Sequence, residues 1–180
     1  MQDIEFLGSP GSPYTRKMLA LLRYRRIPYR VLWGSHFDPP AGYPIPKVKL
    51  LPTFYFPSAN GQEAMVDSTP IIDRLEAEYS GRSVVPDDPV LRFLDRLIED
   101  FADEWLTKAM FHFRWHYEED AKHAGPLLAF WQHPQLNAEQ AKKVSADFAQ
   151  RQISRLYVVG SNAITTSTIE SSYERFIGIM

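Results

Sequence analysis

The stretch 9-SPGSPYTRKMLALL-22 joins a short apolar run, residues 4–7, to a segment with helical periodicity. Ser12 followed by Pro13 is typical of an N-cap and a first helical position. Apolar side chains then recur at three- and four-residue steps, as on the buried side of an amphipathic helix. We therefore predict a strand at residues 4–7 and a helix at residues 13–26, joined by a Ser-Pro-Tyr-Thr turn.

Short strands and a second helix follow within the first 82 residues. Pro28 ends the first helix, and the order of the later elements permits one right-handed parallel crossover followed by an antiparallel hairpin. This is the element order of a thioredoxin-like α/β fold. The expected elements are a strand at 29–33, a proline-rich loop at 34–46, strands at 53–56 and 64–66 on either side of an Asn60-Gly61 turn, and a helix at 69–79.

The composition changes near residue 89. Twelve of the 14 prolines lie in the first 89 residues, whereas the later residues show helical periodicity. We predict a thioredoxin-like domain at 1–82, a linker at 83–89 and an all-helical domain at 90–180. The expected helices of that domain are a long one over residues 90–119, one opened by a capping box of Asn137 and Gln140, and one opened by Ser167 and Glu170. Because the last helix carries an apolar stripe to Met180 without a C-cap, we expect the helical domain to be incomplete.

Composition and charge exclude several classes of function. A chain of 180 residues with 44% hydrophobic and 13% aromatic residues can form a packed core. The net charge of −2, with no long run of like charges, argues against nucleic-acid binding. No apolar run reaches the roughly 20 residues that a membrane span needs, and the acidic N-terminal residues are unlike a secretory signal. We therefore expect a cytoplasmic protein that does not bind membranes.

The chain contains no cysteine. Disulfides, thiolate metal sites and a cysteine nucleophile are therefore excluded, and a disulfide reductase is excluded with them. Any thiol chemistry has to use a thiol that a ligand brings. His112 and His116 stand one helical turn apart and could share a metal with Glu119 or Asp120, but the spacing matches no metal motif, and we predict no metal site.

Three motifs in order support a resemblance to a known family. The Ser-Pro-Tyr-Thr turn has the spacing of the Cys-Pro-Tyr-Cys turn of thioredoxin-like redox proteins, with a hydroxyl in place of each sulfur. With Leu51-Pro52 before a strand and Asp67-Ser68 before a helix, the sequence resembles the cytosolic glutathione transferase superfamily, of the bacterial type. The resemblance implies a first domain that holds glutathione as co-substrate, a helical domain that supplies most of the pocket for a small electrophile, and a homodimer.

The resemblance also implies roles for residues of the turn. Ser12 takes the place of the family's catalytic hydroxyl or cysteine and would donate a hydrogen bond to the glutathione sulfur. A helix N-terminus favours an anion, so a thiol bound there would lose its proton more easily. Ser9 is the second candidate for this hydroxyl and Tyr14 the third, although Tyr14 could instead form a wall of the pocket. Ser12 could also be an N-cap and nothing more.

The remaining implied contacts hold glutathione itself. Leu51 precedes a proline, Pro52, that is cis in the family and exposes the backbone to the cysteinyl part of glutathione. Asp67 would hold the γ-glutamyl ammonium, and Ser68 with the helix N-terminus would hold its carboxylate. The same pair could also act as a plain helix cap. Lys49 would lie near the glycyl carboxylate, and Lys47 is a second candidate for this contact.

Two functions are consistent with these residues. The first is a glutathione transferase that activates the thiol through a serine hydroxyl and adds it to a small electrophile or hydroperoxide. The second is a glutathione-transferase-like binding protein without turnover. Asp67 favours the second function, because the family more often has Glu or Gln at this position.

Overall fold

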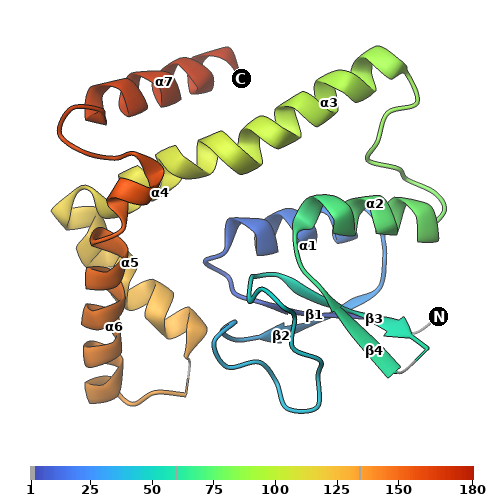
Figure 1. Ribbon diagram of the computed structural model, residues 1–180, viewed down its shortest axis with the longest axis horizontal. Coiled ribbons are helices and arrows are strands. Elements are labelled where there is room, and N and C mark those ends of the chain that lie inside the picture. The colour runs from blue at the N-terminus through green and yellow to red at the C-terminus, as the bar shows by residue number, and fades with distance from the viewer. Residues whose placement is uncertain (1–2, 60, 134) are drawn as a thin grey trace. The chain divides into compact units, whose positions relative to one another are not determined.

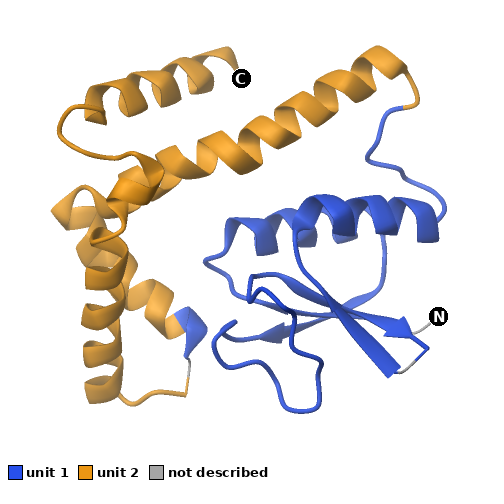
Figure 2. Ribbon diagram, in the orientation of Figure 1, with its two compact units in different colours: residues 1–86, 131–134 blue, residues 87–130, 135–180 orange. Residues whose placement is uncertain are grey.

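The computed structural model describes residues 3–59, 61–133 and 135–180. The chain divides into two compact units, residues 1–86 with 131–134 and residues 87–130 with 135–180 (Figure 2). The first unit holds a β-sheet and two helices, and the second unit is helical. Among the described residues, none of the helices is both long enough and apolar enough to cross a membrane.

The first unit has the thioredoxin-like element order that the sequence predicts (Figure 1). Its mixed sheet has the strand order β2-β1-β3-β4, in which β1 pairs with β2 in parallel and with β3 antiparallel. The hairpin of β3 and β4 is antiparallel as expected, but Asn60 of the predicted turn lies outside the described residues. The elements are β1 (Ile4–Gly8), α1 (Pro13–Arg25), β2 (Tyr29–Trp33), β3 (Thr53–Ser58), β4 (Gly61–Met65) and α2 (Ser68–Glu78).

One face of this sheet packs against both helices. Alternate residues of a strand point to the same face of the sheet. Phe6 of β1 and Phe54 of β3 are directly paired and point to this face, with their rings stacked 4.6 Å apart. Figure 1 shows α1 and α2 on this side of the sheet. The buried cluster consists of Ile4, Phe6, Met18, Leu19, Leu21, Leu22, Ile27, Phe54, Phe56, Ile71, Ile72 and Leu75.

Helix α1 is fixed at both ends by its own sequence. Ser12 is the N-cap, and its hydroxyl oxygen accepts a hydrogen bond from the Thr15 amide at 3.1 Å. Arg26 ends the helix in a left-handed conformation with φ 58°, and the amide of Ile27 returns to the Leu22 carbonyl. The turn before α1 is therefore held in place by the helix that follows it.

A polar cluster ties the loop between β2 and β3 to the sheet. The Glu5 carboxylate accepts hydrogen bonds from Arg30 and from the Tyr43 hydroxyl, the latter at 2.8 Å. The hydrogen bond from Tyr43 and the charge and hydrogen bond of Arg30 lower the pKa of Glu5, against the opposing effect of burial. This loop leads into the Leu51-Pro52 motif, so the cluster limits where that motif lies.

We expect Glu5→Gln to lower stability near neutral pH by an amount that shrinks in acid. A carboxyl whose pKa is lower in the folded state stabilises the fold above its unfolded pKa, and this contribution is lost as the pH falls through the folded pKa. The stabilisation by Glu5 is therefore lost at pH values below 4.5, the ordinary pKa of a glutamate. Urea unfolding over a pH series measures it, with Asp38→Asn in the exposed loop as control. A wild-type advantage that stays constant with pH would contradict this role.

The second unit contains the predicted helices with two corrections. The long helix expected over 90–119 is wrong at its end, because α4 stops at Trp115 and a new helix starts at Glu118. A π-helical segment, η1, also interrupts it. The elements are α3 (Pro89–Phe101), η1 (Ala102–Leu106), α4 (Thr107–Trp115), α5 (Glu118–Gln132), α6 (Ala138–Ile153), a 3-10 turn η2 (Leu156–Val159) and α7 (Thr166–Ile179).

The two predicted capping boxes have different outcomes. The box of Asn137 and Gln140 is confirmed at the start of α6. The box of Ser167 and Glu170 is wrong, because the Asn162 side chain accepts hydrogen bonds from the Ile164 and Thr165 amides and the helix begins at Thr166.

Glu170 and the buried His112 belong to one polar cluster of the second unit. Nδ1 of His112 lies 2.8 Å from the Ser161 hydroxyl, and Nε2 lies 3.4 Å from the Glu170 carboxylate. His112 also stacks on His116, with ring centroids 4.5 Å apart. In the part of the chain that the structure describes, no group of three or more His, Cys, Asp or Glu residues is arranged to hold a metal ion.

Candidate functional site

The turn between β1 and α1 places Ser12 at the start of a helix of 13 residues. The Ser12 amide donates to the Ser9 carbonyl at 3.0 Å, which closes the turn. The Ser12 hydroxyl accepts from the Thr15 amide and donates to the Leu51 carbonyl at 3.4 Å. This last bond joins two of the three motifs, although 39 residues separate them along the chain.

Ser9, the second candidate for the reactive hydroxyl, is buried. It is 3% exposed, and its amide donates to the hydroxyl of the fully buried Thr15 at 3.3 Å. The neighbouring Gly8 is needed for this packing, because a Cβ there would lie 2.7 Å from a Thr15 methyl carbon. The half-buried Ser12 is therefore better placed than Ser9 to meet a ligand.

The Leu51–Pro52 peptide bond is cis, as the family resemblance implies. Pro52 is buried and Leu51 is half-buried, so the bond lies at the edge of the core beside the Ser12 turn. Thr53 starts β3 directly afterwards, and its hydroxyl donates to the Leu50 carbonyl at 2.7 Å. The backbone on both sides of the proline is thus anchored.

Asp67 and Ser68 form the start of α2. Asp67 is the N-cap, and its carboxylate accepts a hydrogen bond from the Thr69 amide at 3.2 Å. Its backbone has φ 76° and ψ 119°, a region that costs a non-glycine residue about 1–3 kcal/mol and that is enriched at functional sites. Ser68 is 3% exposed, and its hydroxyl accepts from the Lys17 ammonium at 2.9 Å.

The contact of Lys17 with Ser68 is not among the contacts that the three motifs predict. Lys17 lies one helical turn after Pro13, where a lysine within an amphipathic helix is usually a solvated side chain. Its contact with Ser68 spans 51 residues, so no local pattern reveals it. In the sequence, the single indication of such a role is that Lys17 follows the Ser-Pro turn by one helical turn.

The other two predicted residues are Tyr14, in α1, and Lys49, in the loop before β3. Tyr14 is the second residue of α1 and is half-buried. Lys49 is exposed in the loop before β3 and lines a small cavity of about 10 Å³ together with His36 and Tyr55. In the structure, Ser12 contacts Leu51 and Lys17 contacts Ser68. Lys49 lies on the side of the loop that faces Tyr55.

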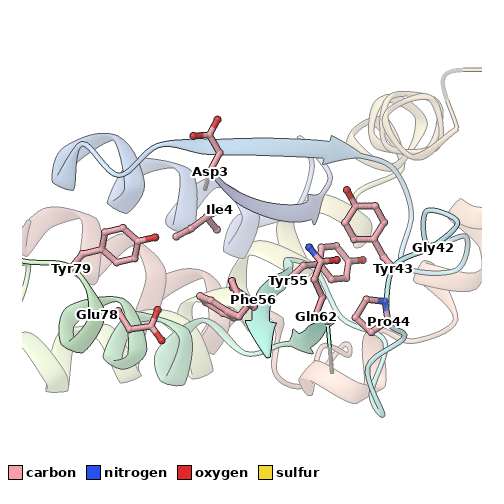
Figure 3. Close-up of a pocket in the computed structure, with 12 residues that line it drawn as sticks. Asp3, Ile4, Gly42, Tyr43, Pro44, Tyr55, Phe56, Gln62, Glu78 and Tyr79 are labelled. Atoms are coloured by element: carbon pink, nitrogen blue, oxygen red, sulfur yellow. The ribbon is translucent and has the colours of Figure 1, made fainter. Parts of the chain in front are cut away.

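A hollow of about 1010 Å³ lies elsewhere on the first unit. Figure 3 shows Glu78 and Tyr79 at one end of it and Tyr43 and Pro44 at the other. The hollow adjoins Asp3 and Ile4 at the start of β1, whereas the Ser12 turn follows the end of that strand. None of the predicted site residues lines this hollow. The site that the motifs predict is therefore not in the hollow.

The match to a family model concerns the first unit. The model of the family described as "Glutathione S-transferase, N-terminal domain" matches residues 6–83, which include all three motifs. Residues 6–83 are therefore similar to the N-terminal domain of glutathione S-transferases. The match begins at Phe6 within β1 and continues past the end of α2, so it covers most of the thioredoxin-like fold.

A curated relative and two solved structures are also similar to the chain. A protein of Glycine max named "Probable glutathione S-transferase" is 24% identical over 112 residues, which are 61% of this chain and 48% of that protein. The chain thus matches about half the length of this curated relative.

The solved structures are of a glutathione transferase family member from Pseudomonas fluorescens. One, with bound S-(propanoic acid)-glutathione, is 23% identical, has a TM-score of 0.40 and covers 86% of this chain and 69% of its own. The other, with bound glutathione, is 22% identical, has a TM-score of 0.37 and covers 87% and 69%. The similarity to this family rests on the match to residues 6–83.

Proposed function

We propose that this chain binds glutathione at the Ser12 turn and favours its thiolate for attack on a small electrophile or hydroperoxide. The observation that carries the proposal is the hydrogen bond from the Ser12 hydroxyl to the Leu51 carbonyl, inside a matched transferase domain. It joins a hydroxyl at a helix N-terminus to the backbone that precedes the cis proline.

Each part of glutathione has a partner in this proposal. The backbone at Leu51 pairs with the cysteinyl part, and Pro52 holds that backbone in place. Asp67 accepts from the γ-glutamyl ammonium, and Ser68 at the N-terminus of α2 donates to its carboxylate. Lys49 attracts the glycyl carboxylate, and Tyr14 forms a wall beside the sulfur.

The Ser12 hydroxyl can exchange one acceptor for another. Its hydrogen bond to the Leu51 carbonyl is long at 3.4 Å, and such bonds are weak. When the cysteinyl amide of glutathione donates to that carbonyl, the Ser12 proton can turn to the sulfur. The hydroxyl and the N-terminus of α1 then stabilise the thiolate, and each unit of pKa depression corresponds to about 1.4 kcal/mol.

The thiolate is the nucleophile of the reaction. With a carbon electrophile, a sulfur electron pair forms the new C–S bond while the leaving group departs with its electrons. With a hydroperoxide, the sulfur attacks the outer oxygen and the O–O bond breaks, which gives an alcohol and glutathione sulfenic acid. A second glutathione then forms the disulfide and releases water.

A glutathione-binding protein without turnover is the second candidate. The observation that favours it is the hydrogen bond from the Thr69 amide to Asp67, because this carboxylate already caps α2. A homodimer, a cytoplasmic location and the domain limits 1–82, 83–89 and 90–180 stay predictions.

The ultraviolet absorbance of the thiolate tests the proposal. We expect the thiol of bound glutathione to have a pKa about one to two units below that of free glutathione in the wild type, and close to the free value in Ser12→Gly. Glycine is preferred to alanine because it costs an N-cap only a few tenths of a kcal/mol, roughly. Ser58→Gly, at the exposed end of β3, is the control. An unshifted pKa in the wild type would leave the binding protein as the better description.

A further inference from the structure

Lys17 and Ser68 form a contact that connects α1 to the start of α2. The Lys17 ammonium donates to the Ser68 hydroxyl at 2.9 Å, and both side chains belong to the first unit. None of the three sequence motifs contains Lys17. The motifs place only the Ser68 hydroxyl and the N-terminus of α2 at this position. The contact with Lys17 adds a positive charge to them.

The burial of Ser68 determines what a ligand meets there. Ser68 is 3% exposed and Lys17 is half-buried, so the ammonium covers part of the approach to the hydroxyl. A ligand group that hydrogen-bonds to Ser68 comes within reach of Lys17. An anion gains from both partners, whereas a cationic group would lie beside a like charge.

The neighbouring Asp67 adds the opposite charge. Its backbone adopts a sparsely populated conformation, which fixes the direction of the side chain at the helix start. Lys17 contacts Ser68, the residue that follows Asp67, so an ammonium and a carboxylate both occur at the start of α2 and could match the two charges of an α-amino acid end group. The γ-glutamyl end of glutathione is such a group.

We propose that Lys17 binds the α-carboxylate of the γ-glutamyl group and makes the site selective for thiols that carry this carboxylate. The proposal rests on the glutathione-binding function above. The competing explanation is structural, in which Lys17 only ties α1 to α2 and acts on the ligand through the position of Ser68.

Glutathione and two analogues separate these explanations in calorimetric titrations. γ-Aminobutyryl-cysteinylglycine lacks the α-carboxylate, and glutaryl-cysteinylglycine lacks the α-ammonium. We expect Lys17→Met to weaken glutathione and the glutaryl analogue by about tenfold or more, and to leave the γ-aminobutyryl analogue unchanged. Lys17→Arg keeps the charge and should retain most of the affinity. Arg23→Met removes an exposed charge from the last turn of the same helix and serves as control.

The outcomes distinguish this proposal from the function on which it rests. If the wild type binds glutathione and Lys17→Met weakens all three ligands equally, or none of them, the carboxylate role is wrong while glutathione binding stands. If the folded wild type binds none of the ligands, both proposals fail. Thermal unfolding of each variant, with Lys17→Gln as a second neutral replacement, shows whether a loss of affinity comes from a loss of fold.

Discussion

Replacing Phe54 with alanine is expected to destabilise the N-terminal unit by about 4 kcal/mol. Phe54 is fully buried, with its ring 4.6 Å from the Phe6 ring and 5.9 Å from the Phe56 ring. Alanine leaves a cavity between the central strands and the two helices, and the loss combines the transfer free energy with the cost of that cavity. Because the Leu51-Pro52 motif enters β3 at Thr53, glutathione binding should weaken as the fold is lost.

Urea unfolding followed by circular dichroism measures this effect. Phe54→Leu keeps most of the volume and should cost clearly less than alanine. Phe37→Ala changes a ring that is 55% exposed, and it should lie within about 0.5 kcal/mol of the wild type. Equal effects at Phe54 and Phe37 would show that the stacked rings are not the centre of this core.

Arg25→Met is expected to cost about 3 kcal/mol, because it breaks a buried ion pair. The Arg25 side chain is 1% exposed, its Nη1 lies 3.0 Å from the Glu76 carboxylate, and its Nη2 donates to the Tyr79 carbonyl at 2.6 Å. These contacts join the last turn of α1 to the last turn of α2. Removing Arg25 leaves the Glu76 carboxylate without its cation in a site that is mostly shielded from water.

A second substitution tests whether the unpaired charge causes the loss. Glu76 also accepts hydrogen bonds from Ser83 and the Val84 amide, so Glu76→Gln keeps an acceptor while it removes the charge. In urea unfolding, the Arg25→Met/Glu76→Gln double variant should be more stable than Arg25→Met alone. A double variant with the summed loss of both single variants would rule out coupling between the two charges.

The local parts of the fold were predictable from sequence, and the distant contacts were not. Ser12-Pro13 marks the start of α1 because capping depends on neighbouring residues, and Asn137 marks α6 for the same reason. Ser167 is not a cap because it lies inside α7, which begins at Thr166 after a turn that Asn162 closes through the Ile164 and Thr165 amides. Asn162 and Ser167 are both residue types that favour helix starts and turns, so spacing alone does not tell which of them precedes the helix.

The candidate site shows the same limit. The motifs identify Ser12, Leu51 and Ser68, since each precedes or opens a regular element. The Lys17–Ser68 contact depends on how α1 and α2 pack against the sheet, which a pattern along the chain does not contain. The roles given to the site residues, Ser12 above all, stay predictions until a ligand is measured.

Calorimetric titration of the folded wild-type chain with glutathione tests the central claim most directly. We expect saturable binding with one glutathione per chain, weakened by Ser68→Ala and unchanged by the exposed control Ser58→Ala. Ser12→Gly should bind glutathione with near wild-type affinity, since its hydroxyl acts on the thiolate. A folded protein that shows no saturation at millimolar glutathione would contradict the account and restrict the family match to the fold.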